Sequence, residues 1–245
     1  MNGMLASVAN LAEARLVDSF NVDIIDLKQP ALGALGSLAP QEVADIVSQL
    51  NTDRKISATI GDLPMQPDLL YAAVKAMSAT GVDFVKIGFF PNGNWPACIA
   101  GLAELAKQGR HLIAVLFADT RPELSIIHAL GQAGFRGVML DTQDKTLGSL
   151  TQLFSLQECQ DFVVQAKSVG LLSGLAGSLN IKDVPKLLPL QADYLGFRGA
   201  LCHLHQRTAE LDPKQIADIG QLLHGHQQPL MHEYMPRLVF ENSQA

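Results

Sequence analysis

Short apolar runs recur along the chain, and each is followed by a turn signal and then by a stretch with the periodicity of a helix. The predicted strands are residues 4–8, 22–28, 55–60, 83–88, 111–117, 137–141, 171–176 and 193–197. The predicted helices are residues 11–18, 40–50, 68–79, 97–108, 122–133, 149–168, 181–187 and 213–223. Alternation of this kind is typical of a parallel sheet built from β-α units.

The number of these units favours one fold. Eight β-α units in roughly 220 residues match the count and the size of a (β/α)8 barrel. A doubly wound open sheet also alternates strands and helices, but no G-x-G-x-x-G follows the first predicted strand, and nothing in the middle indicates a reversal of strand order. We therefore predict an α/β fold, a single-domain (β/α)8 TIM barrel over residues 1–223. Residues 224–245 lose the periodicity and are predicted to be a tail or an excursion.

Composition and charge narrow the range of partners. The 245 residues are 48% hydrophobic and 17% charged, which suits a folded domain with a sizeable core. The net charge of −6 and the scattered lysines and arginines predict no binding to nucleic acid. No apolar run approaches the roughly 20 residues that span a bilayer, and the first residues lack the basic segment of a signal peptide. We expect a cytoplasmic protein without a membrane partner.

Charged residues gather where the predicted strands end, which is where a barrel places its reacting groups. Asp26 and Lys28 end the second strand and point to the same side of it, because they are two residues apart. Lys86 lies inside the fourth apolar run, while Asp141 ends the sixth and Lys145 follows it in the loop. Asp26 and Lys28 alone could equally form a strand-end salt bridge. Three lysines around one mouth favour Schiff-base chemistry, with carboxylates to transfer protons.

Small residues after the last two predicted strands indicate a phosphate site. Gly177 and Ser178 follow the seventh strand, and Arg198 and Gly199 follow the eighth. Small residues let backbone N–H groups approach an anion, an arginine adds a planar charged fork, and these loops hold phosphate in many barrels. The same glycines would also suit plain tight turns. The pattern predicts an imine-forming lyase or aldolase acting on a phosphorylated carbonyl compound, with a phosphate-binding isomerase as the alternative.

Other polar residues give weaker signals. The histidines at 203, 205, 224, 226 and 232 have no partner carboxylate at a defined spacing, and the three cysteines have no C-x-x-C spacing. We therefore expect no metal, no disulfide framework and no other cofactor. Asp119 and Arg121, at the end of the fifth strand, are candidates for substrate contacts or for a local ion pair.

Six motifs in register carry a resemblance to a known family. They are residues 23–30 with 33–36, 57–64, 85–88, 139–142, 175–178 and 198–202, which read DIIDLKQP with GALG, SATIGDLP, VKIG, MLDT, LAGS and RGALC. Together they resemble the (5-formylfuran-3-yl)methyl phosphate synthases, the aldolase-like enzymes of methanofuran biosynthesis. The match runs in order from about residue 4 to residue 202.

The resemblance implies a (β/α)8 barrel that joins two molecules of glyceraldehyde 3-phosphate. One molecule is first isomerised to dihydroxyacetone phosphate, and loss of phosphate and water then closes the furan ring. Lys28 matches a Schiff-base lysine and Lys145 a second catalytic lysine. The remaining charged residues, Lys86, Asp26 and Asp141, are assigned to proton transfer. The resemblance also implies a phosphate cradle made of Gly177, Ser178, Arg198 and Gly199.

Two departures accompany the resemblance. The loop after Asp141 lacks the glycine and lysine that archaeal members tend to carry after the residue matching Lys145, and the histidine-containing segment after Cys202 differs from the glycine- and charge-rich end of the family. Another class I aldolase and a non-catalytic phosphosugar-binding barrel remain the alternatives. A homo-oligomer is compatible with the sequence.

Overall fold

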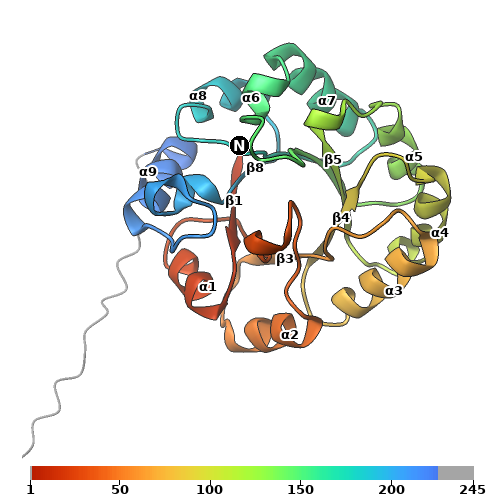
Figure 1. Cartoon of the computed structure of the whole chain (residues 1–245), viewed down its shortest axis with the longest axis horizontal. Helices are drawn as coiled ribbons and strands as arrows, with labels where there is room; N and C mark the ends of the chain where they lie inside the picture. Colours follow the sequence, from red (N-terminus) through yellow and green to blue (C-terminus); the bar gives the residue numbers. More distant parts are fainter. Residues whose placement is uncertain (1, 226–245) are drawn as a thin grey trace, which may run out of the picture.

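Eight parallel strands close into a barrel in the computed structural model of the chain, which describes residues 2–225 (Figure 1). The strands are β1 (Gly3–Val8), β2 (Ile24–Leu27), β3 (Lys55–Thr59), β4 (Phe84–Phe89), β5 (Leu112–Phe117), β6 (Gly137–Asp141), β7 (Leu172–Leu175) and β8 (Tyr194–Phe197). Each strand pairs with its neighbours in sequence, and β1 pairs with both β2 and β8. The predicted (β/α)8 fold is confirmed.

The helices form an outer ring around the strands (Figure 1). They are α1 (Leu11–Asp18), α2 (Pro40–Gln49), α3 (Pro67–Ser78), α4 (Trp95–Lys107), α5 (Ile126–Gln132), α6 (Leu150–Leu153), α7 (Leu156–Ser168), α8 (Val184–Leu187) and α9 (Pro213–His224). Short 3-10 turns follow several strands: η1 (Pro30–Leu32), η2 (Ala118–Thr120), η4 (Gly199–Leu201) and η5 (His203–His205), with η3 (Leu188–Leu190) after α8. Most of the predicted tail, residues 226–245, lies outside the described residues.

The helix predicted over residues 149–168 is wrong in one respect, because the structure divides it into α6 and α7. The division lies at Ser155, whose hydroxyl accepts the Glu158 N–H at 3.2 Å while the Glu158 carboxylate accepts the Ser155 N–H at 2.7 Å. This capping box satisfies the first N–H groups of a new helix. The helices predicted over 122–133 and 181–187 also begin later than expected, at Ile126 and Val184.

The strands separate an outer apolar core from a mixed interior. Outward-facing residues of the strands pack under the helices, and a smaller apolar cluster inside the barrel contains Leu5, Ile24, Phe84 and Met139. Above this cluster, parallel register places Ser7 beside Asp26 and Asp26 beside Ser57. A polar layer therefore lies on an apolar one inside the barrel.

The loop that contains η1 lies over the mouth of the barrel (Figure 1). The Asp62 carboxylate holds it by accepting the N–H groups of Ala34 at 2.9 Å and Leu35 at 2.7 Å. Ala34 and Leu35 are buried in the interior apolar cluster together with Phe117. Apolar side chains thus cover one part of the mouth, and charged side chains line much of the remainder.

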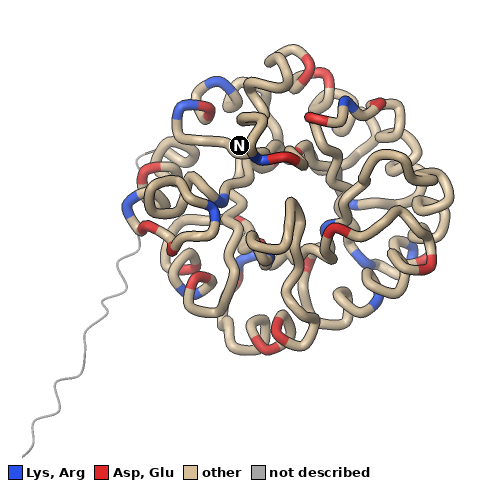
Figure 2. Tube along the Cα trace, in the orientation of Figure 1, with Lys and Arg blue, Asp and Glu red and all other residues tan. Residues whose placement is uncertain are grey.

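Acidic and basic residues are both distributed around the outer ring, and a few lie near the centre of the barrel (Figure 2). Charged groups inside a barrel are costly unless they are paired or hydrogen-bonded, so they are the residues that define the site.

No helix within residues 2–225 combines the length and the apolar character needed to cross a bilayer.

Candidate active site

A cavity of about 350 Å³ opens at the carboxyl ends of the strands. Eight of the nine predicted site residues line it: Lys28, Lys86, Asp141, Lys145, Gly177, Ser178, Arg198 and Gly199. The ninth, Asp26, is fully buried at 0% exposure and contacts Lys86 from beneath. The strand-end pattern therefore identified residues that the fold brings together.

Asp26 is the centre of a buried polar cluster. Its carboxylate accepts hydrogen bonds from the Ser7 hydroxyl at 2.8 Å, the Ser57 hydroxyl at 2.6 Å and the Lys86 ammonium at 2.9 Å. Burial favours the neutral acid, but the charges of Lys86 and Lys28 and these hydrogen bonds outweigh it, so the pKa of Asp26 is lowered. Asp26 therefore remains a carboxylate at neutral pH and holds Lys86 in place.

Lys28 is a buried amine without a carboxylate at ion-pair distance in the part of the chain that the structure describes. Its side chain is 5% exposed. Burial lowers its pKa to about 8, with Asp141 opposing the shift and the cations Lys86 and Lys145 adding to it. About a tenth of such an amine is neutral at pH 7. Lys28 is thus a lysine poised to act as a nucleophile.

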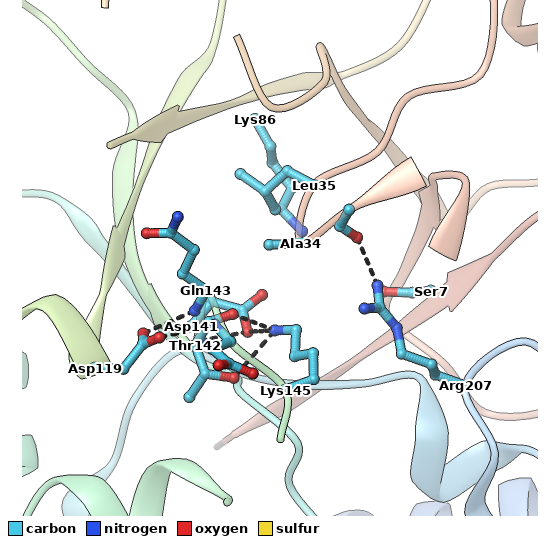
Figure 3. A network of polar contacts seen from close by, with 12 residues as sticks. Ser7, Ala34, Leu35, Lys86, Asp119, Asp141, Thr142, Gln143, Lys145 and Arg207 are labelled. Atoms are coloured by element: carbon cyan, nitrogen blue, oxygen red, sulfur yellow. Dashed lines mark hydrogen bonds and ion pairs between the residues drawn. The ribbon is translucent and has the colours of Figure 1, made fainter. Parts of the chain in front are cut away.

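Lys145 and Asp141 form a second charged pair on the other side of the cavity (Figure 3). The Lys145 ammonium lies 2.5 Å from the Asp141 carboxylate and also donates to the carbonyl and hydroxyl of Thr142. Burial opposes ionisation of Asp141, but Lys145 and Lys28 outweigh it and lower its pKa. A carboxylate between two lysines can pass protons between them and a bound molecule.

Unpaired backbone N–H groups line the cavity at the ends of β7 and β8. Within residues 2–225, no acceptor is found for the N–H groups of Gly177, Ser178, Gly199 and Ala200. Gly177 and Ser178 have φ values of 105° and 48°, and a Cβ on Gly177 would lie 2.8 Å from the Thr142 methyl group. Successive N–H groups in such a turn form a concave site for an anion.

Arg198 has a different geometry from the one expected of a phosphate ligand. Its Nη1 and Nη2 donate to the two Glu13 carboxylate oxygens at 2.5 and 3.2 Å. Its remaining N–H groups donate to the carbonyls of Ser7, Arg207 and Ala209. A guanidinium has five N–H groups, and none is left for a phosphate. Arg198 therefore ties β8 to α1 and to the segment that follows, and we assign the anion contacts to backbone groups.

A sequence profile of the 4-HFC-P synthase family matches residues 4–220. The chain belongs to this family. A Methanopyrus kandleri relative named (5-formylfuran-3-yl)methyl phosphate synthase is 32% identical over 217 residues, which are 84% of this chain and 91% of the relative. A Methylorubrum extorquens relative to which the same activity is attributed is 40% identical over 216 residues, 87% of this chain and 88% of the relative. The resemblance is confirmed, and this 4-HFC-P synthase family member is an enzyme.

Solved structures support the fold of this family member. The chain matches 3-hexulose-6-phosphate synthase from Salmonella typhimurium with a TM-score of 0.64, 16% identity and coverage of 92% of this chain and 100% of the other. It matches phosphoribosyl anthranilate isomerase from Thermus thermophilus with a TM-score of 0.63, 13% identity and coverage of 91% and 98%. At these identities the likeness shows the barrel architecture alone.

Histidines contribute little to the site of this 4-HFC-P synthase family member. His203 lies 3.5 Å from Asp212 and His224 lies 3.3 Å from Asp23, whereas His205 lines the cavity. Among residues 2–225, no group of three histidine, cysteine or acidic residues is arranged to hold a metal ion. His226 and His232 lie outside the described residues.

Asp119 positions the loop that carries Lys145 in this family member. It accepts the N–H groups of Gln143 and Asp144, both at 2.7 Å (Figure 3). Arg121 pairs instead with Glu158 at 2.7 Å, so an Asp119–Arg121 ion pair, one of the two expectations, is wrong. The sequence predicts that Asp119 lies at a strand end, but only the fold shows that it binds the loop after β6.

Replacing Asp119 with alanine is expected to loosen this loop. A lost hydrogen bond to a charged acceptor costs about 1.5–3 kcal/mol. Both hydrogen bonds to Asp119 are exposed to solvent, so we expect the variant to lose stability near the lower value. Hydrogen exchange of the Gln143 and Asp144 amides should become faster, while exchange in β2 should not change. Equal protection of these amides in the variant would contradict the positioning role.

Proposed function

We propose that this enzyme condenses two molecules of glyceraldehyde 3-phosphate, one of them through dihydroxyacetone phosphate, into (5-formylfuran-3-yl)methyl phosphate, as a step in the biosynthesis of a methanofuran-type cofactor. The names of its relatives support the product. The observation that carries the mechanism is the unpaired, buried Lys28 with a pKa of about 8 in a cavity that contains both charged pairs. A neutral amine of this kind attacks carbonyl carbons.

The proposed reaction begins at Lys28. Its neutral nitrogen adds to the carbonyl carbon of a triose phosphate, and loss of water gives an imine. When this triose is glyceraldehyde 3-phosphate, removal of the C2 proton gives an enamine that expels the C3 phosphate, and C3 then forms the new carbon–carbon bond with the ketone carbon of dihydroxyacetone phosphate. Closure of the ring releases two waters, and hydrolysis of the imine regenerates the enzyme amine. The conversion is redox-neutral, so its balance requires no oxidant or reductant.

In this proposal the two charged pairs, Asp141 with Lys145 and Asp26 with Lys86, have different parts in proton transfer. Asp141 and Lys145 both line the cavity and are joined to each other, so they can exchange a proton with the substrate. Asp26 does not line the cavity, and it acts through Lys86, which does. Lys86 is thus the group that meets the substrate, and Asp26 is the group that orients it.

Reductive trapping tests the imine. The protein is incubated with glyceraldehyde 3-phosphate and borohydride, and its intact mass and its peptides are measured. The expected result is a reduced adduct on Lys28, together with a furan aldehyde and inorganic phosphate in the untrapped reaction. An adduct without a furan would indicate another class I aldolase. Tight binding of triose phosphate without any adduct would indicate an isomerase or a binding barrel and would contradict the proposal.

The rate of trapping should depend on pH through the ionisation of Lys28. Only the neutral amine attacks, so the rate is expected to rise with a midpoint near pH 8 and to level off above it. Asp141 raises the pKa of Lys28, so Asp141→Asn should move this midpoint to lower pH. Asp144→Asn, which changes an exposed carboxylate in the same loop, should leave it in place. A midpoint above 10 in the wild-type protein would show that Lys28 is an ordinary lysine.

A further inference from the structure

Two cations in the cavity lack a carboxylate partner. Three of the five cations that line it are neutralised in pairs: Lys86 with Asp26, Lys145 with Asp141 and Arg198 with Glu13. Within residues 2–225, neither Lys28 nor Arg207 has a carboxylate at ion-pair distance, and both line the cavity. Lys28 is accounted for by the proposed imine, whereas Arg207 has no role in that chemistry.

Arg207 is held across the cavity by a well-connected segment. Residues 202–212 form a strap after β8, closed by an antiparallel bridge between Cys202 and Leu211. Arg198 fixes the strap by donating to the Arg207 carbonyl at 2.8 Å. The Arg207 side chain is half-buried and reaches the loop after β2, where its Nη2 donates to the Gly33 carbonyl at 2.7 Å (Figure 3).

The rest of the Arg207 guanidinium is available to a ligand. The bond to Gly33 uses one of its five N–H groups, and no other acceptor for them is found in the described part of the chain. A half-buried guanidinium with free N–H groups is suited to a phosphate, which it can bind through two parallel hydrogen bonds. Its tip contacts the loop after β2, whereas the unpaired backbone N–H groups belong to the loops after β7 and β8.

We propose that Arg207 forms a second anion-binding subsite, which takes the phosphate group of one triose phosphate while the backbone N–H groups at Gly177, Ser178, Gly199 and Ala200 take the other. This inference rests on the proposed function, because condensation of two triose phosphates brings two phosphate groups into one cavity. Arg198, whose five N–H groups all donate to acceptors within the protein, is a positioning residue for the strap.

Equilibrium dialysis of the full-length protein with radiolabelled inorganic phosphate tests the subsite. The wild-type protein should bind two phosphate ions per chain, and Arg207→Met should bind one. Arg54→Met is the matched control, because Arg54, which directly precedes β3, is also half-buried and also donates to one carbonyl, that of Phe20. The Arg54→Met variant should bind two phosphate ions. A wild-type protein that binds fewer than two ions, or an Arg207→Met variant that still binds two, would overturn the proposal.

Kinetics separate this inference from the proposed reaction. Arg207→Met should raise KM for glyceraldehyde 3-phosphate roughly 10- to 100-fold, the effect of losing a charge-assisted hydrogen bond. Arg207→Lys keeps the charge and should have a smaller effect, and it replaces the methionine variant if that one does not fold. Phosphate binding does not depend on an imine. Two phosphate sites without borohydride adducts would contradict the reaction alone, and adducts with an unchanged KM in both variants would contradict the subsite alone.

Discussion

Replacing Lys28 with methionine is expected to abolish turnover and to make the barrel more stable. Loss of the amine removes the nucleophile, and removal of a covalent catalytic group typically lowers kcat by roughly four orders of magnitude or more. Methionine has a similar length and no charge, so it fills the buried position without the cost of an unpaired ammonium. Activity and stability should therefore change in opposite directions.

The stability gain has a defined dependence on pH. The pKa of Lys28 is about 8 in the folded protein, against 10.5 for a free lysine, and this difference corresponds to about 3 kcal/mol. At pH 7, below both values, the folded protein carries the full cost of the buried charge, so the variant should be more stable by up to that amount. The advantage should shrink as the pH rises from 8 and disappear above 10.5, where the unfolded lysine is also neutral.

Urea denaturation at pH 7 and pH 10 and borohydride trapping measure the two effects. Lys107→Met, which changes an exposed lysine at the end of α4, is the control and should alter neither stability nor activity by much. Lys145→Met should lower turnover but still give an adduct on Lys28. Turnover in Lys28→Met would show that the Lys28 amine is not the nucleophile. A stability equal to that of the wild type at pH 7 would show that burial of the Lys28 ammonium has no cost.

The barrel and most of the cavity could be predicted because both depend on features that are local in sequence. Eight apolar runs separated by helical stretches define the strands, and several strand ends carry a reactive residue, such as Lys28 or Asp141. Parallel closure then places every carboxyl end at one mouth. Once the fold is known, no further information is needed to bring these side chains together.

The partners of each charge could not be predicted in the same way. Lys86 pairs with Asp26, 60 residues away, and Arg198 pairs with Glu13, 185 residues away. An arginine at a strand end beside glycines has the same sequence pattern whether it binds a phosphate or an internal carboxylate. Arg207 lies in a segment without periodicity, and its reach to Gly33 depends on a strap that only the fold defines.

Replacing Asp26 with alanine is expected to destabilise the protein more than any other single change in the site. Lys86 is 3% exposed and its carboxylate partner is Asp26, so the variant would leave a buried ammonium unpaired. The hydroxyls of Ser7 and Ser57 would also lose their acceptor. Breaking a buried ion pair from one side costs about 3–5 kcal/mol, and urea denaturation should show a loss of that size.

The double variant Asp26→Ala/Lys86→Met distinguishes two costs: that of leaving the Lys86 ammonium buried without a partner, and that of losing the attraction between Lys86 and Asp26. Removing both members leaves neither charge of this pair without its partner, and such replacements are often neutral in stability, so the double variant should recover most of what Asp26→Ala loses. Lys55→Met, which breaks the exposed Lys55–Asp83 pair, should cost about 0–1 kcal/mol. If the double variant is no more stable than Asp26→Ala, the loss of stability in Asp26→Ala does not come from the unpaired Lys86 ammonium. In either case the double variant should be inactive, because Lys86 is the member of the pair that lines the cavity.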